Sequence, residues 1–205
     1  MIKAVIFDVD GVLIDNTEII IRIFQETARK CGLRIPDERT VKNYFGRTRV
    51  EMVQNILGKD ERILKTYDET WMEHENEMKL MPGIDKILDE IKLPKAVMTS
   101  KSLPSAERSL KGLLHHFRAT VTMEETKKHK PDPEPLLLAC KKLNLKPNEC
   151  VYVGDHINDF KTAKSAGTDF IGILSGGTTE EEFKKAGANK LINSLSELPE
   201  ILKSI

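Results

Sequence analysis

The sequence predicts an α/β protein with a doubly wound parallel sheet and a small all-helical domain inserted after the first strand. Two observations predict the sheet. Short apolar runs alternate with helix-like segments, and these runs are continuously apolar rather than alternating with polar residues. Both are typical of parallel strands covered by helices on both faces. A third observation predicts the insert, because residues 16–81 show only helical periodicity. We therefore expect a core domain of residues 1–15 and 82–205 and a helical cap at 16–81.

Six apolar runs rich in β-formers are the predicted strands, at 4–7, 95–99, 118–122, 150–153, 170–174 and 190–192. Helical patterns outside the insert lie at 83–92, 103–114, 134–143, 158–166, 179–187 and 196–204. Asp132 followed by Pro133 predicts a helix N-cap with proline at the first helical position. Gly167 predicts the end of the helix before the fifth strand.

The insert begins with the clearest helical pattern of the chain. Isoleucines and Phe24 recur at intervals of three and four along TEIIIRIFQETARKCG, and Gly32 marks the end. Two further helical segments follow, RVEMVQNILG and DERILKTYDETWMEHENEMKL. The last contains Trp71, the only tryptophan, which we expect to pack between the helices of the insert rather than to stack on a ligand. Pro82 and Gly83 return the chain to the sheet.

Composition excludes several function classes. The 205 residues include 32 basic and 32 acidic side chains, so the formal net charge is zero and nothing indicates a nucleic acid or membrane partner. No apolar run approaches the roughly 20 residues of a membrane span, and the apolar N-terminal stretch is too short for a signal peptide. Cys31, Cys140 and Cys150 lack metal-ligand spacing, which favours reduced structural thiols and a cytoplasmic location.

Polar side chains gather at the predicted carboxyl ends of the strands, where open parallel sheets bind ligands. In strand order they are Asp8 and Asp10, then Thr99, Ser100 and Lys101, then Lys130, and then Asp155 and Asp159. Helix capping or surface charge explains each one singly, but three carboxylates at one edge need a compensating charge. Oxygen ligands without a His or Cys cluster select Mg²⁺, and hydroxyls, lysines and free N–H groups suit a phosphate.

Four motifs in order, DVDGVLID, VMTSK, HKPDPEP and VYVGDHIND, span essentially the whole chain. Together they resemble the haloacid dehalogenase-like hydrolase superfamily, and the insert lies where that family has its helical cap. The sequence is most similar to the phosphoglycolate phosphatase group, whose neighbours include β-phosphoglucomutase and a pyrophosphatase. The resemblance implies a cytoplasmic Mg²⁺-dependent phosphatase, a monomer or homodimer, that hydrolyses small phosphomonoesters such as phosphoglycolate through an aspartyl phosphate.

The resemblance assigns a role to each residue at the strand ends. Asp8 would be the nucleophile, and Asp10 the general acid that protonates the leaving oxygen and then the base that activates water. Mg²⁺ would be held by the carboxylates of Asp8 and Asp155 and by the backbone carbonyl of Asp10. Asp159 would be a further or outer ligand. The phosphoryl group would be bound by Thr99, the main-chain N–H of Ser100 and Lys130. Two adjacent acids are compatible because one stays ionised on the cation while the other carries a proton.

Asp10 also separates branches of the family. Dehalogenases lack an acid at this position and transport ATPases have threonine, so Asp10 favours hydrolysis or a mutase reaction. A phosphosugar mutase of the β-phosphoglucomutase type and a pyrophosphatase therefore remain alternatives. A non-enzymatic phospho-accepting module is a weaker one, because receiver domains share the acid cluster but lack a helical insert.

The insert is expected to close over the sheet edge, with hinges near 15–17 and 81–83. Its segment YFGRTRVEM contains Arg47 and Arg49. Either one of them contacts a carboxylate or second phosphate of the substrate, or both are exposed arginines at a helix start. We interpret His74, His115, His116 and His129 as surface or core residues without a ligand role. His156 lies inside the fourth motif, close to the predicted metal site, and is not interpreted as a metal ligand.

Overall fold

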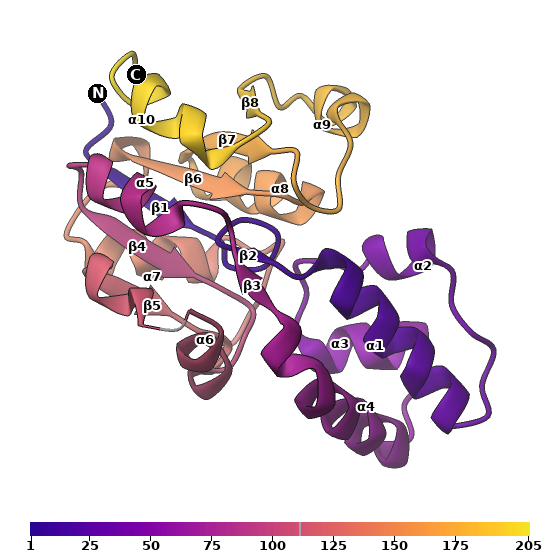
Figure 1. The fold of residues 1–205 in the computed structure, drawn as a ribbon. Coiled ribbons are helices and arrows are strands. Elements are labelled where there is room, and N and C mark those ends of the chain that lie inside the picture. The colour runs from indigo at the N-terminus through magenta and orange to yellow at the C-terminus, as the bar shows by residue number, and fades with distance from the viewer. Residues whose placement is uncertain (111) are drawn as a thin grey trace.

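A computed structural model describes residues 1–110 and 112–205 and contains the predicted doubly wound parallel sheet (Figure 1). Its six strands run in the order β5-β4-β1-β6-β7-β8 and all neighbours pair in parallel. The strands are β1 (Ala4–Phe7), β4 (Lys95–Met98), β5 (Ala119–Val121), β6 (Cys150–Gly154), β7 (Asp169–Ile173) and β8 (Leu191–Ile192). The strand order reverses between β1 and β6, and doubly wound sheets bind ligands at such a reversal.

Helices cover both faces of the sheet (Figure 1). Outside the insert they are α5 (Ile84–Glu90), α6 (Leu103–Leu110), α7 (Glu134–Lys142), α8 (Ile157–Ala166), α9 (Glu180–Ala186) and α10 (Leu198–Ile201). Short 3₁₀ turns are η1 (Glu75–Glu77), η2 (Leu113–His116), η3 (Met123–Glu125), η4 (Pro147–Glu149) and η5 (Leu195–Glu197). Successive β1 residues face opposite sides, so Val5 and Phe7 join one apolar cluster while Ala4 and Ile6 join the other, beneath α7 and α8. This double burial explains the continuous apolar runs.

Several helix boundaries differ from the predictions. The helix after the third strand begins at Glu134, and Pro133 rather than Asp132 occupies its N-cap position. The Asp132 carboxylate still accepts a hydrogen bond from the Glu134 N–H at 3.0 Å, so its capping function is kept from one position further out. The helix predicted at 103–114 ends at Leu110, and its position 111 lies outside the described residues. Gly167 ends α8 with φ 76°, as predicted.

The insert after the first strand is confirmed as helical. It contains α1 (Thr17–Lys30), α2 (Glu38–Lys42), α3 (Arg49–Ile56) and α4 (Glu61–His74), which lie together beside the sheet in Figure 1. An antiparallel ribbon of two-residue strands, β2 (Ile14–Asp15) and β3 (Lys79–Leu80), joins it to the rest of the chain. The prediction of no strand within 16–81 was therefore wrong at β3, because a two-residue strand is too short to show alternation. The domain boundaries themselves stay a proposal.

The insert contacts the residues that follow the sheet strands. The Ser100 hydroxyl donates to the Gly46 carbonyl at 2.9 Å, and the Asn158 amide donates to the Phe45 carbonyl at 3.0 Å. The tip of the insert thus lies against the carboxyl edge of the sheet. Within the described residues, no helix combines the length and apolarity that crossing a membrane requires.

Candidate active site

Three buried carboxylates from separate parts of the chain meet at the carboxyl edge of the sheet. Asp8 follows β1, Asp155 follows β6, and Asp159 lies in the first turn of α8. Each offers an oxygen within 4.8 Å of the others. Their residues are 4%, 4% and 0% exposed, so bulk solvent screens their charges only weakly. The predicted convergence of acids is found, with Asp159 inside the cluster.

Lys130 is the cation of this cluster. Its ammonium group lies 2.9 Å from Asp8 Oδ1 and 2.8 Å from Asp159 Oδ1, and its side chain is 1% exposed. The Tyr152 hydroxyl donates a further hydrogen bond to Asp159 Oδ1 at 2.9 Å. With all three acids ionised and one lysine among them, the cluster carries two uncompensated negative charges. A divalent cation matches that excess.

The electrostatics of the cluster are strained without such a cation. Burial raises the pKa of Asp8 to about 7, and Asp159 and Asp10 add to the effect while Lys130 opposes it. Burial, with the charges of Asp159 and Asp8, raises the pKa of Asp155 well above its usual range. Burial alone would lower the pKa of Lys130, but Asp159 and Asp8 outweigh it and hold the amine protonated.

Two glycine-containing loops shape the space around Asp155. A Cβ on Gly176 would lie 1.8 Å from Asp155 Oδ2, and one on Gly11 would lie 2.5 Å from the same oxygen. Gly11 also has φ 72°, a conformation that glycine adopts without strain. The Gly177 N–H donates to Asp155 Oδ2 at 3.1 Å. The two glycine loops therefore leave space beside the Asp155 carboxylate that any larger side chain would fill. The donor atoms around this space are all oxygens, which fits a hard divalent ion.

Asp10 lies beside the cluster but has its own partners. Its Oδ1 accepts a hydrogen bond from the Asn16 amide at 2.5 Å and pairs with the Lys101 ammonium at 2.9 Å. Lys101 was noted at a strand end in the sequence, but its pairing was not predicted, and Asn16 was missed. The lysine is the last residue of VMTSK, whereas nothing in the local sequence marks Asn16.

The two predicted phosphate-binding hydroxyl residues lie differently. Ser100 lines a cavity of about 50 Å³ that also exposes Asp8 and Lys130. Thr99 is 3% exposed and does not line that cavity, and its hydroxyl accepts the Lys101 N–H at 3.2 Å. Of the site residues predicted from the sequence, the cavity wall brings together Asp8, Asp10, Arg47, Ser100, Lys130 and Asp155.

The two insert arginines, Arg47 and Arg49, lie in different surroundings. Arg47 reaches the small cavity, and its buried Nε has no hydrogen-bond partner. Arg49 does not line it; its guanidinium pairs with Asp68 at 2.5 Å, and its side chain is 49% exposed.

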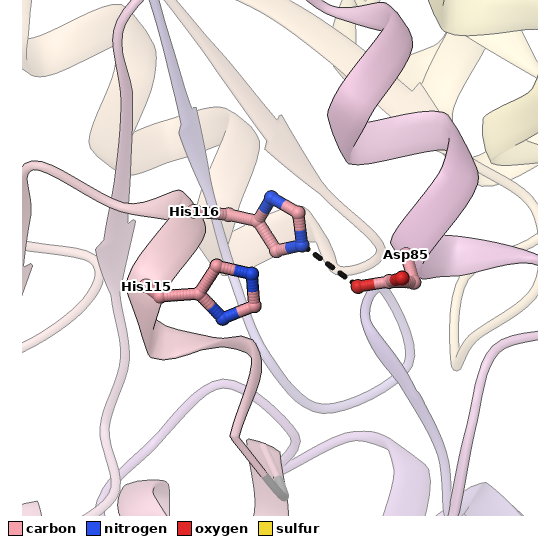
Figure 2. Close-up of side chains that lie close together, drawn as sticks. All are labelled: Asp85, His115 and His116. Atoms are coloured by element: carbon pink, nitrogen blue, oxygen red, sulfur yellow. Dashed lines mark hydrogen bonds and ion pairs between the residues drawn. The ribbon is translucent and has the colours of Figure 1, made fainter.

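The histidines contribute little to the site. His156 caps α8, and burial lowers its pKa, which keeps the ring neutral. Figure 2 shows His115 and His116 close to Asp85, with His116 Nε2 at 2.8 Å from the carboxylate. This cluster joins η2 to α5 and shares no residue with the acid cluster. His74 bridges Glu26 and Glu77 in the insert.

Fold and acid cluster together define an α/β enzyme with a carboxylate-rich site at the switch point of its sheet. The model of the haloacid dehalogenase-like hydrolase family matches residues 5–173. The chain belongs to this family of hydrolases and is a phosphatase of its type.

Three relatives place it within the family. A putative pyrophosphatase PpaX of Caldanaerobacter subterraneus is 34% identical over 98% of this chain and 95% of the relative. An N-acetylmuramic acid 6-phosphate phosphatase of Pseudomonas putida is 29% identical over 99% and 97%. A phosphoglycolate phosphatase of Chromobacterium violaceum is 28% identical over 99% and 97%. The predicted resemblance to this group is confirmed, while the three names differ in substrate.

Among solved structures, a putative haloacid dehalogenase-like hydrolase from Bacteroides fragilis superimposes with a TM-score of 0.87. It is 26% identical, and the match covers 97% of this chain and all of the other. The fold is thus shared over the full length, including the helical insert.

Proposed function

We propose that the protein is a Mg²⁺-dependent phosphatase of small phosphomonoesters that acts through an aspartyl phosphate on Asp8. The observation that carries the proposal is the buried set of three acids and one lysine, with its excess of two negative charges beside a cavity. Asp8, Asp155, Asp159 and the backbone carbonyl of Asp10 are the groups that would hold Mg²⁺. When bound, Mg²⁺ supplies positive charge that keeps Asp8 ionised and neutralises the phosphoryl oxygens.

In the first step an Asp8 carboxylate oxygen attacks phosphorus, and the bond between phosphorus and the ester oxygen breaks. Asp10 gives its proton to the leaving oxygen, so an alcohol departs and an acyl phosphate remains. Lys130 lies against Asp8 and stabilises the charge on the transferring group, with the Ser100 N–H as a further donor. Thr99, whose hydroxyl does not line the cavity, would reach the phosphoryl group only after a local rearrangement. Phosphoryl transfer requires mainly positioning and charge neutralisation, which these residues supply.

In the second step Asp10 takes a proton from water as the water attacks phosphorus. The bond between Asp8 and phosphorus breaks, inorganic phosphate leaves, and Asp8 returns as a carboxylate. Lys101 and Asn16 hold the Asp10 side chain at the cavity wall. We propose that residues 16–81 form the cap over a core of 1–15 and 82–205, and that one of the two cap arginines, Arg47 or Arg49, contacts an anionic group of the substrate.

Phosphate release from 4-nitrophenyl phosphate with Mg²⁺ tests the mechanism. The Asp8→Asn variant should lose at least about 10³-fold in kcat, because the amide cannot form the covalent intermediate. Asp85→Asn, which changes an exposed aspartate outside the site, is the matched control and should retain the parent rate. Persistent turnover in Asp8→Asn would refute the mechanism. Conversion of a hexose 1-phosphate to its 6-phosphate, with little free phosphate, would instead support the mutase alternative.

A further inference from the structure

A second and larger cavity adjoins the small one at Asp8. Its volume is about 280 Å³, and Asp10, Arg47 and Ser100 line both cavities, so the two are neighbours with a shared wall. Its insert side includes Tyr67 and Trp71, both from α4. The sequence predicted that Trp71 packs between the insert helices. Its ring also faces the sheet edge, where Lys101 Nζ lies 4.5 Å from the ring centre.

The insert is docked on the core around this cavity. Besides the contacts of Gly46 and Phe45 described above, Arg108 of α6 pairs with Glu75 of η1 at 2.9 Å. The cavity is consequently the space that remains when insert and core are in contact. A leaving group attached to a phosphoryl group in the small cavity would extend into it.

The volume discriminates between substrate classes. A second phosphate or a glycolate has only about five non-hydrogen atoms and is much smaller than the drug-sized ligands that typical pockets hold. Either would leave much of a cavity of about 280 Å³ unfilled. Sites for larger organic ligands begin near ~300 Å³, which is close to the volume found here. The cavity fits a leaving group the size of a substituted six-membered ring.

The residues that line the cavity restrict the chemistry of the leaving group further. Tyr67, Trp71 and Met52 form an apolar surface of the kind that contacts the carbon face of a sugar ring. Arg49 is paired with Asp68, and Arg108 with Glu75, so these cations already have partners.

Arg47 differs from the other cavity arginines. Among the described residues it forms no ion pair, and its Nε is buried without a hydrogen-bond partner. An anionic ligand group would give this buried donor the partner that it lacks.

We propose that the substrates are phosphorylated rings of sugar size that carry a carboxylate, with the ring against Trp71 and the carboxylate on Arg47. This rests on the proposed phosphatase activity and names its substrate class. Pyrophosphate and phosphoglycolate are poor substrates because they leave the apolar wall uncovered.

The kinetic test compares N-acetylmuramic acid 6-phosphate, glucose 6-phosphate, phosphoglycolate and pyrophosphate with Mg²⁺. We expect kcat/KM for the ring that bears a carboxylate to exceed that for phosphoglycolate at least ~10-fold. Trp71→Ala should lower kcat/KM about 10-fold for both ring esters and less than about 2-fold for phosphoglycolate. Arg47→Met should affect the ring with the carboxylate more than glucose 6-phosphate. Arg62→Ala, on the same helix as Trp71 and with a side chain 89% exposed, is the control and should change nothing.

A binding test separates this proposal from the proposed activity. Trp71 is the only tryptophan, so its fluorescence reports the cavity directly. In Asp8→Asn, N-acetylmuramic acid 6-phosphate should change this fluorescence saturably, whereas phosphoglycolate should not. If the wild type hydrolyses 4-nitrophenyl phosphate but prefers phosphoglycolate or pyrophosphate, or if the fluorescence does not respond to the ring ester, the substrate class is refuted and the phosphatase stands. If the fluorescence responds but no ester is hydrolysed, the phosphatase falls and the ligand class is supported.

Discussion

Replacing Lys130 with methionine should destabilise the fold strongly and in a pH-dependent way. The substitution keeps an unbranched apolar chain that is one atom shorter and removes an ammonium group that contacts both Asp8 and Asp159. Breaking a buried ion pair by removing one partner costs about 3–5 kcal/mol, because the other charge stays buried and unpaired. For a chain of this size that loss corresponds to a fall in Tm of roughly 6–20 °C.

The pH dependence follows from the pKa of Asp8. Its folded value of about 7 lies above the unfolded value of 3.8, so the native state binds more protons between these values. The free energy of unfolding therefore falls as the pH rises from about 4 through about 7. Removing Lys130 takes away the charge that opposes this shift, which raises the folded pKa of Asp8 further. The difference between variant and wild type should thus be largest at pH 8 and should shrink toward pH 4.

Urea denaturation followed by circular dichroism, in EDTA at pH 5 and pH 8, measures both effects. Lys161→Met, at an exposed position of α8, is the matched control and should stay within about 0.5 kcal/mol of wild type. The double variant Lys130→Met with Asp159→Asn should recover part of the loss, since one buried charge is then removed. A loss below about 1 kcal/mol at pH 8, or one that is equal at both pH values, would refute the electrostatic account.

Three further outcomes are expected. Saturating Mg²⁺ at 100 times its Kd should add about 2.7 kcal/mol to the free energy of unfolding, measured by thermal shift, and the gain should vanish in Asp155→Asn; an equal gain in the variant would place the ion elsewhere. Gly176→Ala should weaken this Mg²⁺ effect because the new methyl group displaces Asp155, and an unchanged titration curve would contradict that. Hydrogen bonds that the His74 ring donates to Glu77 and Glu26 raise the pKa of His74, so their contribution should be present below pH 6.5 and be lost as the pH rises through the raised value. His74→Gln should therefore cost up to about 1 kcal/mol at pH 5.5 and less at pH 8.5, and a loss that grows with pH would disprove the assignment.

The sequence predicted the sheet and the acid cluster because both depend on local patterns. A buried parallel strand needs a continuous apolar run, and a carboxylate directly after such a run is placed at the sheet edge by topology alone. Asp8 and Asp155 could be assigned to one place for this reason, whereas Lys130 lies in a loop well beyond the end of β5 and was assigned through its motif. The position of Asp159 one turn into α8 follows in the same way, because its motif continues directly from β6.

The pairings of Asp10 could not be predicted. Its contact with Lys101 depends on a side-chain conformation, and its contact with Asn16 depends on how the chain leaves β2. The contact between the Trp71 ring and Lys101 was also missed, since helical periodicity shows which residues are apolar but not how the insert docks on the sheet. Contacts between the two parts of the chain are tertiary information that a one-dimensional pattern does not carry.

The short ribbon of β2 and β3 has a consequence for how this architecture can vary. Asp15 pairs directly with Lys79, so the two ends of the intervening 63 residues are neighbours in space. A tight turn across that pair would complete an ordinary β-hairpin and leave the six-stranded sheet with its carboxylates intact. Another segment inserted between the same two residues would therefore change the part of the site that the insert contributes, including the Asn16 contact with Asp10, and leave the carboxylates at the sheet edge in place.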